Sequence, residues 1–209
     1  MNFEWRNKQN NANLIVFFSG WGSDKNINLN LKHNNFDILI IFNYKTFESI
    51  NFDFSNYTKK YLIAWSMGVF VCNYYYETFK DFDKLIAING TQSPIDDNYG
   101  ISQNIYDLTI KNFNELSCSK FIKKMSPNLS IDKYCTRTIE DLKNELISIK
   151  NLKISNFLTF NKSIISLKDR IIPTKNQINW WQNRCELIEQ LENTHHYIFD
   201  NYTNWSDLI

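Results

Sequence analysis

The hydrophobic positions of this chain gather in short apolar runs that are continuous rather than alternating. These runs are rich in β-branched and aromatic side chains, and they cover residues 14–18, 36–42, 61–65, 85–89, 154–160 and 164–167. Such runs are typical of strands buried on both faces of a parallel sheet. Helical patterns at 69–79 and 176–191 indicate alternating strands and helices. We therefore predict an α/β fold with a mostly parallel central sheet flanked by helices.

The segment 104–150 has a different pattern, because it is polar, helical and rich in lysine. We interpret it as a small helical lid inserted above the sheet. The chain has 209 residues, a length that suits one domain. We therefore expect residues 1–209 to form a single domain that carries this lid.

Net charge, apolar runs and cysteine spacing argue against nucleic-acid, membrane and zinc partners. The net charge of +1 and the isoelectric point of about 7.6 leave no basic excess to neutralise nucleic-acid phosphates. No apolar run reaches the roughly 18 residues of a membrane span, and the first residues lack a signal-peptide pattern. The four cysteines, at positions 72, 118, 135 and 185, lack the spacing of a zinc site. We expect a cytoplasmic monomer with no metal, cofactor, nucleic acid or membrane partner.

Ser66 follows the buried run at 61–65 and precedes a helical pattern. Its context, Ala64-Trp65-Ser66-Met67-Gly68, is close to the G-x-S-x-G nucleophile elbow, with Ala64 in place of the first glycine. The elbow needs small flanking residues because the turn from strand to helix is tight. The alternative is a serine that caps a helix. The strand before Ser66 and the helix after it favour the nucleophile.

A serine hydroxyl needs a base at neutral pH, and the chain has three histidines, His33, His195 and His196. His33 precedes the second apolar run, at the end of the sheet away from the expected site. His195 and His196 lie near the C-terminus, where the chain order of serine hydrolases places the base. A solvated histidine pair is the alternative, and the scarcity of histidine favours the base.

The base in turn needs a carboxylate that fixes its tautomer. Asp169 follows the apolar run at 164–167, and Pro173 helps to end that strand. Taken alone, Asp169 would be interpreted as an ordinary turn residue. The order of Ser66, Asp169 and a late histidine favours the acid instead.

An ester hydrolase also needs N–H donors for the oxyanion of its intermediate. Met67, the residue after the candidate nucleophile, supplies one, and the glycine turn Ser19-Gly20-Trp21-Gly22 places the N–H of Trp21 as the second. The alternative for this turn is a purely structural one, with Trp21 as a core aromatic.

Four segments together resemble the α/β-hydrolase superfamily: Gly20-Trp21-Gly22, Trp65-Ser66-Met67-Gly68, Asp169-Arg170-Ile171-Ile172-Pro173 and His196-Tyr197-Ile198-Phe199. They are also similar to the motifs of pimeloyl-[acyl-carrier protein] methyl ester esterases, and residues 89–101 resemble the short BioG-type variant. The His-x-x-Phe pattern of that family implies that His196, rather than His195, is the base. Ser19 and Ala64 depart from the family's usual His and Gly, at positions that supply no group to the mechanism.

The resemblance implies a serine carboxylester hydrolase that cleaves the methyl ester of pimeloyl-acyl-carrier protein in the synthesis of the biotin precursor pimelate. Its partner would be the acidic acyl-carrier protein, and the lysines of the predicted lid are candidates to dock it: Lys111, Lys120, Lys123 and Lys124. A solvated helix face explains these lysines equally well. Two other functions stay open, a generic small-molecule carboxylesterase or thioesterase on the same triad, and a non-catalytic binding protein of the same fold.

Overall fold

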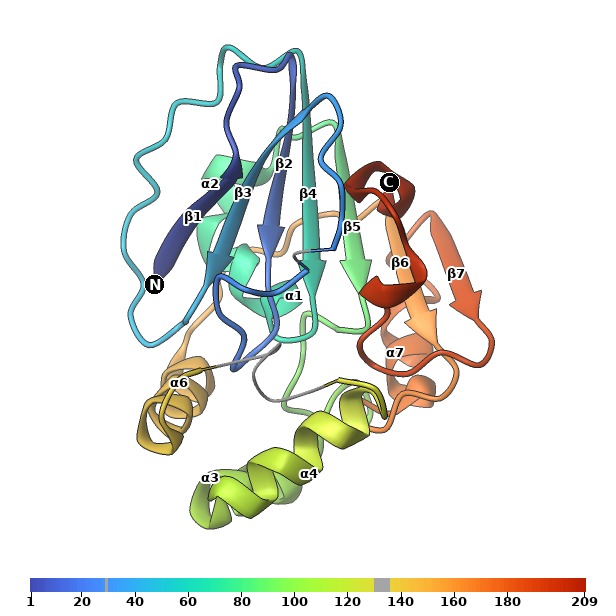
Figure 1. Ribbon diagram of the computed structural model, residues 1–209. Coiled ribbons are helices and arrows are strands. Elements are labelled where there is room, and N and C mark those ends of the chain that lie inside the picture. The colour runs from blue at the N-terminus through green and yellow to red at the C-terminus, as the bar shows by residue number, and fades with distance from the viewer. Residues whose placement is uncertain (29, 130–135) are drawn as a thin grey trace.

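The computed structural model describes residues 1–28, 30–129 and 136–209, which build a seven-stranded sheet covered on both faces (Figure 1). The strand order is β1-β3-β2-β4-β5-β6-β7. The strands are β1 (Asn2–Asn7), β2 (Asn13–Phe18), β3 (Phe36–Phe42), β4 (Lys59–Trp65), β5 (Lys84–Ile88), β6 (Lys162–Ser166) and β7 (Leu187–Leu191). Five neighbouring pairs are parallel, and β1 pairs with β3 antiparallel. The predicted mostly parallel sheet is confirmed.

The helices cover the sheet and its carboxyl end. They are α1 (Gly68–Val71), η1 (Cys72–Tyr75), α2 (Tyr76–Phe79), α3 (Gln103–Asn112), α4 (Glu115–Met125), α6 (Ile139–Asn151), α7 (Thr174–Trp181), η2 (Phe199–Asn201) and η3 (Trp205–Leu208). In Figure 1, α1, α2 and α7 lie behind the sheet, and the C-terminal segment lies in front of it. The helices α3 and α4 lie below the arrowheads of the parallel strands. Helices α3, α4 and α6 thus lie in the described part of the segment interpreted as a lid.

The continuous apolar pattern of the strands follows from this two-sided covering. Phe17 and Phe18 are adjacent in β2, so their rings point to opposite faces of the sheet. The ring of Phe17 packs against Phe199 and Trp205 of the C-terminal segment, at centroid distances of 5.5 and 5.0 Å. The ring of Phe18 packs against Phe79 of α2 at 5.4 Å. A polar residue at either position would face a buried layer, and both residues are fully buried.

The strand predicted at 154–160 is wrong. Its apolar residues Leu158 and Phe160 are buried, but none of the strands in the described ranges pairs with the backbone there. Side chains bind the backbone of Leu158 instead: its N–H donates to Oδ1 of Asn73 at 2.8 Å, and its C=O accepts from the side-chain amide of Gln92 at 2.9 Å. A short buried run therefore shows the same apolar sequence pattern whether its backbone hydrogen bonds are made by neighbouring strands or by buried side-chain amides.

Two predicted helices are wrong in part. The one at 176–191 ends early, because α7 stops at Trp181 and residues 187–191 form β7 at the edge of the sheet. The one at 69–79 is divided into α1, η1 and α2, where the Asn73 amide donates to the carbonyl oxygens of Val69 and Phe70. Polar side chains that bind nearby backbone in this way compete with the regular helical pattern.

The edge strand β1 was not predicted, since its sequence NFEWRN is largely polar. An antiparallel edge strand needs only one apolar face, which gives a weak signal over six residues. Among the residues described, no helix combines the length and the apolar character that crossing a membrane requires. Cys72, Cys118 and Cys185 are free thiols, and Cys135 lies outside the described residues.

A buried carboxylate, that of Asp37 in β3, joins this sheet to two loops. It accepts hydrogen bonds from the N–H groups of Gln9 and Asn11, from the Asn11 amide and from the Tyr57 hydroxyl, at 2.7–3.2 Å. Burial by itself raises the pKa of Asp37, but these four donors stabilise the ionised form and bring the pKa below its ordinary value. The ionised side chain therefore stabilises the fold.

Replacing this carboxylate, in Asp37→Asn, is expected to lower the free energy of unfolding at pH 7 by about 1–3 kcal/mol. The folded-state pKa lies below the unfolded value of about 3.9, so the contribution is complete above that pH and is lost as pH falls through the folded-state pKa. Thermal unfolding followed by circular dichroism between pH 7 and pH 3 measures both proteins. The gap between their melting temperatures should be constant at neutral pH and shrink toward pH 3. A gap that stays constant to pH 3 contradicts the assignment.

Candidate active site

Ser66 occupies a sharp turn directly after the central strand β4. Its φ of 56° lies in the left-handed region, which is costly for a residue with a side chain. Neighbouring backbone packs against the turn from both sides. An added Cβ at Gly68 would lie 2.5 Å from the Phe18 carbonyl oxygen, and one at Gly90 would lie 2.4 Å from the Ser66 carbonyl oxygen. The turn therefore tolerates only small neighbours, as an elbow requires.

Two hydrogen bonds link Ser66, His196 and Asp169 into a chain. The distance from Ser66 Oγ to His196 Nε2 is 2.8 Å, and the distance from His196 Nδ1 to Asp169 Oδ2 is also 2.8 Å. Ser66 follows β4, Asp169 follows β6 and His196 follows β7. The carboxyl ends of these parallel strands therefore bring together positions up to 130 apart in sequence. The imidazole that meets Ser66 is that of His196, not that of His195. The Ser66 side chain caps no helix, since α1 has Met67 at its N-cap and no side-chain cap bond.

The Asp169 carboxylate is oriented by several donors. Its Oδ1 accepts from the N–H groups of Ile171 and Ile172, at 2.8 and 3.1 Å. Its Oδ2 accepts from the Gln177 amide at 2.8 Å, besides its contact with His196. Gln177 comes from α7 and is fully buried. The sequence pattern did not single out Gln177, because a glutamine on a predicted helix resembles a solvated residue until the fold places it.

Hydrogen bonds fix the backbone of His196 as well as its ring. Its carbonyl oxygen accepts from the indole N–H of Trp65 at 3.0 Å and from the Asn89 amide at 2.9 Å. Asn89 also donates to Ser166 Oγ and accepts from the Ser166 N–H, at 2.8 and 2.7 Å. It thus joins the ends of β5 and β6 to the histidine loop. The apolar pattern includes Asn89 in the run 85–89 and did not predict this role, whereas the structure ends β5 at Ile88.

The glycine turn after β2 lies against the serine. An added Cβ at Gly20 would lie 3.2 Å from Ser66 Cβ and 3.0 Å from the ring of Trp65. The neighbouring Trp21 is buried, and its ring packs edge-on against Phe113 and Phe121 at 5.1 and 4.8 Å. Trp21 is therefore a core aromatic whose backbone also borders the site.

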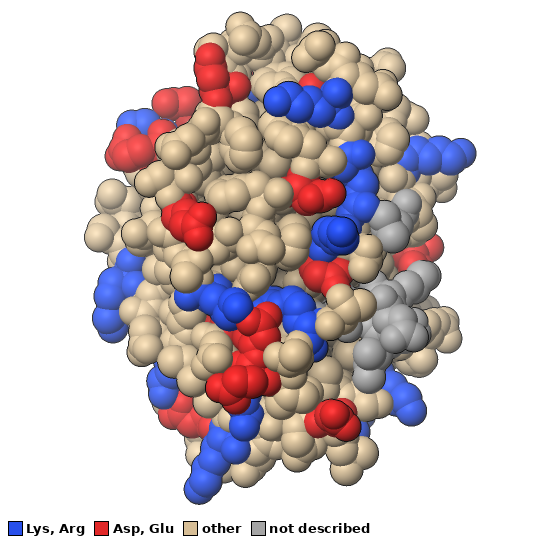
Figure 2. Space-filling model, turned by 60° about the vertical axis from the view of Figure 1, so that its left-hand side comes forward, with Lys and Arg blue, Asp and Glu red and all other residues tan. Residues whose placement is uncertain are grey.

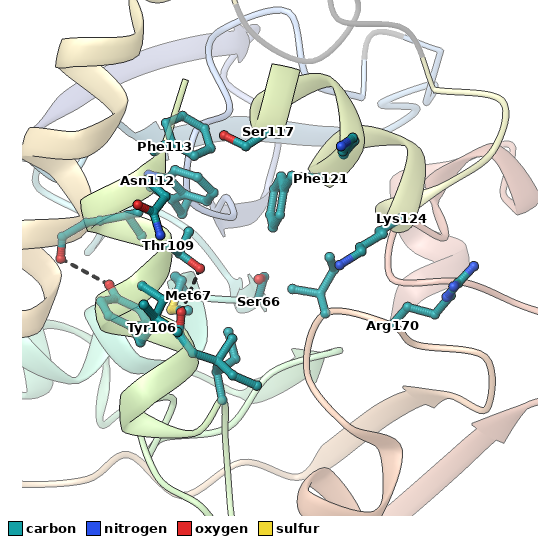
Figure 3. Close-up of a pocket in the computed structure, with 17 residues that line it drawn as sticks. Ser66, Met67, Tyr106, Thr109, Asn112, Phe113, Ser117, Phe121, Lys124 and Arg170 are labelled. Carbon is teal, nitrogen blue, oxygen red and sulfur yellow. Dashed lines mark hydrogen bonds between the residues drawn. The ribbon is translucent and has the colours of Figure 1, made fainter. Parts of the chain in front are cut away.

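A cavity of about 390 Å³ opens above Ser66 and Met67 (Figure 3). Its walls come mainly from α3 and α4, and they include Tyr106, Thr109, Phe113 and Phe121. Figure 3 shows Lys124, from α4, and Arg170, from the loop after β6, on the same side of this cavity. Of the four lysines considered for docking, Lys120 and Lys124 line the cavity, whereas Lys111 and Lys123 are exposed on the same two helices outside its lining. Arg170 was not predicted, although it adjoins Asp169.

A mostly parallel sheet with a strained serine after a central strand defines the α/β-hydrolase class. Solved esterases share this fold: the esterase EaEST of Exiguobacterium antarcticum superimposes with a TM-score of 0.72, at 14% identity, over 95% of this chain and 89% of that one. The BioG protein of Haemophilus influenzae is more similar, with a TM-score of 0.87 at 28% identity over 100% of this chain and 99% of that one.

The family described as pimeloyl-ACP methyl esterase BioG matches residues 1–208, and the chain therefore belongs to this family of esterases. The predicted resemblance is confirmed. A malonyl-[acyl-carrier protein] O-methyltransferase of Bacteroides fragilis is 34% identical over 192 residues. That match covers 87% of this chain, which spans only 39% of the length of the methyltransferase.

Proposed function

We propose that this chain hydrolyses the methyl ester of pimeloyl-acyl-carrier protein, with Ser66 as nucleophile, His196 as general base and Asp169 as the residue that orients the base. The observation that carries the proposal is the His196 imidazole, 2.8 Å from both the Ser66 hydroxyl and the Asp169 carboxylate at the base of an apolar cavity. Membership in the BioG family supports the choice of ester.

The reaction proceeds in two halves. Ser66 Oγ attacks the ester carbonyl carbon while His196 Nε2 takes its proton, and the N–H groups of Met67 and Trp21 stabilise the resulting oxyanion. The intermediate then collapses: its bond to the methoxy oxygen breaks, the imidazolium gives its proton to that oxygen, and methanol leaves while the acyl group stays bound to Ser66 Oγ as an ester. A water molecule, deprotonated by His196, attacks the carbonyl carbon of this ester; the bond to Ser66 Oγ breaks, the imidazolium returns its proton to Oγ, and the product leaves with a free carboxyl group that ionises at neutral pH. Asp169 stabilises the imidazolium in both halves.

The cavity suits a chain of methylene groups that ends in a methyl ester. Its aromatic walls exclude water from the acyl chain, and each buried CH₂ contributes about 0.8 kcal/mol. The substrate carries its methyl ester at one end and its carrier protein at the other. The acyl chain therefore extends from Ser66 toward the protein surface, and the carrier docks where the cavity opens.

Basic side chains at the cavity support docking of an acidic carrier. Lys120, Lys124 and Arg170 contribute to its lining, and Lys111 and Lys123 extend the basic surface over α3 and α4. On the face drawn in Figure 2, acidic and basic side chains lie next to one another, so that their fields partly cancel. We place the carrier at the mouth of the cavity because basic side chains line it there.

We also propose that the enzyme acts as a monomer in the cytoplasm. Ser66, His196 and Asp169 all come from one chain, so the site needs no second copy. The free thiols of Cys72, Cys118 and Cys185 suit a reducing compartment.

Substituting the nucleophile tests whether this protein is an enzyme at all. The Ser66→Ala variant removes the attacking oxygen and is expected to lower kcat by at least about 10⁴-fold on p-nitrophenyl esters and on pimeloyl-acyl-carrier protein methyl ester. Methanol release and p-nitrophenol absorbance measure the two reactions. Unchanged hydrolysis in the variant refutes the nucleophile, and inactive wild type favours a binding protein. Equal kcat/KM of the wild type for the carrier-bound and the free methyl ester favours a generic esterase.

The acid is tested by Asp169→Asn beside two matched controls, Asp96→Asn and Asp97→Asn. An asparagine at 169 presents an N–H to Nδ1 and favours the histidine tautomer that cannot accept the serine proton, so kcat should fall by about 10³- to 10⁴-fold. Asp96 and Asp97 follow β5 and are expected to retain most activity when substituted. Steady-state kinetics on p-nitrophenyl acetate compare the three. An inactive control beside an active Asp169→Asn would move the acid to the loop after β5.

Charge reversal tests the docking surface. The Lys124→Glu and Arg170→Glu variants place like charges against an acidic carrier, so KM for the carrier-bound ester should rise about tenfold while kinetics on p-nitrophenyl acetate stay unchanged. Lys143→Glu, at a half-buried position of α6 outside the cavity lining, is the control and should leave the kinetics on both substrates unchanged. An unchanged KM for the carrier-bound ester in both reversal variants returns these residues to a solvated surface.

A further inference from the structure

Helix α6 holds the glycine turn that borders Ser66. The indole N–H of Trp21 donates to the carbonyl oxygen of Leu142 at 2.9 Å. One turn further along the helix, Oε2 of Glu145 accepts the backbone N–H of Gly22 at 3.2 Å. Residues three apart lie on one face of a helix, so both bonds are made by the face of α6 that meets the turn.

The same carboxylate also binds Tyr44, whose hydroxyl contacts the other end of the turn. Oε1 of Glu145 accepts the backbone N–H of Tyr44 at 2.8 Å. The Tyr44 hydroxyl donates in turn to the carbonyl oxygen of Ser19 at 2.7 Å. Glu145 therefore holds Gly22 directly and Ser19 through the buried ring of Tyr44, and the backbone of Trp21 lies between these two anchors.

The Glu145 carboxylate is fully buried and paired with an arginine. Arg137 Nη1 lies 2.7 Å from Glu145 Oε2, and the same guanidinium binds Asp141 and the side chain of Asn43. Burial raises the pKa of Glu145, whereas Arg137 and the two backbone N–H groups stabilise the ionised form. Buried ion pairs contribute little net stability compared with apolar residues of the same volume. The position of this pair against the turn therefore points to a role beyond stability.

We propose that Glu145 is a positioning residue that fixes the oxyanion-binding turn in its catalytic geometry, an inference that rests on the proposed esterase function. Donors that stabilise a developing oxyanion must be fixed before the charge forms, because reorganising them during the reaction raises the barrier. The turn contains Gly20 and Gly22, and Gly22 has a φ of 82°. Glycines give the backbone wide conformational freedom. The Glu145 carboxylate removes this freedom without touching the substrate.

The test is Glu145→Gln, which keeps the size of the side chain. Its NH₂ group replaces one of the two acceptor oxygens, so it cannot bind the N–H groups of both Gly22 and Tyr44. We expect kcat on p-nitrophenyl acetate to fall about 10- to 100-fold with KM within twofold of the wild type. Affinity for phenylboronic acid, which forms a tetrahedral adduct on Ser66, should fall by the same factor as kcat/KM.

A variant that is destabilised elsewhere separates positioning from stability. Asp37→Asn lies remote from the turn, and it is expected to lower the melting temperature while kcat and boronate affinity stay within twofold of the wild type. If Glu145→Gln matches the wild type in kcat and in boronate affinity, whatever its melting temperature, the proposal is wrong. A wild type without Ser66-dependent hydrolysis refutes the esterase function instead, so the two failures are distinguishable.

A second variant covers the case in which Glu145→Gln does not fold. Tyr44→Phe keeps the ring and removes only the hydroxyl that holds Ser19. We expect a 3- to 10-fold fall in kcat and in boronate affinity, again with KM little changed. A kcat equal to that of the wild type would overturn the proposal in that case.

Discussion

The backbone of Ser66 is held in a left-handed conformation because neighbouring backbone packs against it. Gly68 lies against β2, and Gly90 lies against the turn itself, so no room exists for a relaxed path between β4 and α1. The cost of the strained conformation is met by the packing of the sheet around it. Everything else in the site is arranged around the direction in which this turn presents the serine hydroxyl.

Polar side chains at the carboxyl ends of the buried strands complete that arrangement. Asn89 after β5 and Ser166 at the end of β6 bind one another, and Asn89 and Trp65 hold the carbonyl of His196. Buried polar groups are costly unless they are hydrogen-bonded, so a network whose members satisfy one another also fixes their geometry. The histidine ring is thus aimed by both its backbone and Asp169.

The sheet was predictable from local patterns, whereas the Ser66–His196–Asp169 cluster needed the chain order of its members and the family resemblance that favoured His196 over His195. Continuous apolar runs mark two-sided burial, and the residues after such runs lie at one edge of a parallel sheet. The residues that support the cluster were not predictable in this way. Gln177 and Glu145 lie on helices in polar sequence, and their burial depends on which face the fold turns inward. The segment 154–160 failed for the same reason, since Asn73 and Gln92 rather than a strand satisfy its backbone.

The described helices between β5 and β6 make two different kinds of contact with the site. Helices α3 and α4 form the cavity walls, and their inward side chains contact the space that an acyl chain would fill. Helix α6 instead binds the turn beside the serine through Leu142 and Glu145. An exchange of the cavity walls with those of another esterase would accordingly begin at residue 103, where α3 begins, and end at residue 125, where α4 ends. An exchange that extended through α6 would replace the cavity walls and also Leu142 and Glu145, which hold the turn beside Ser66.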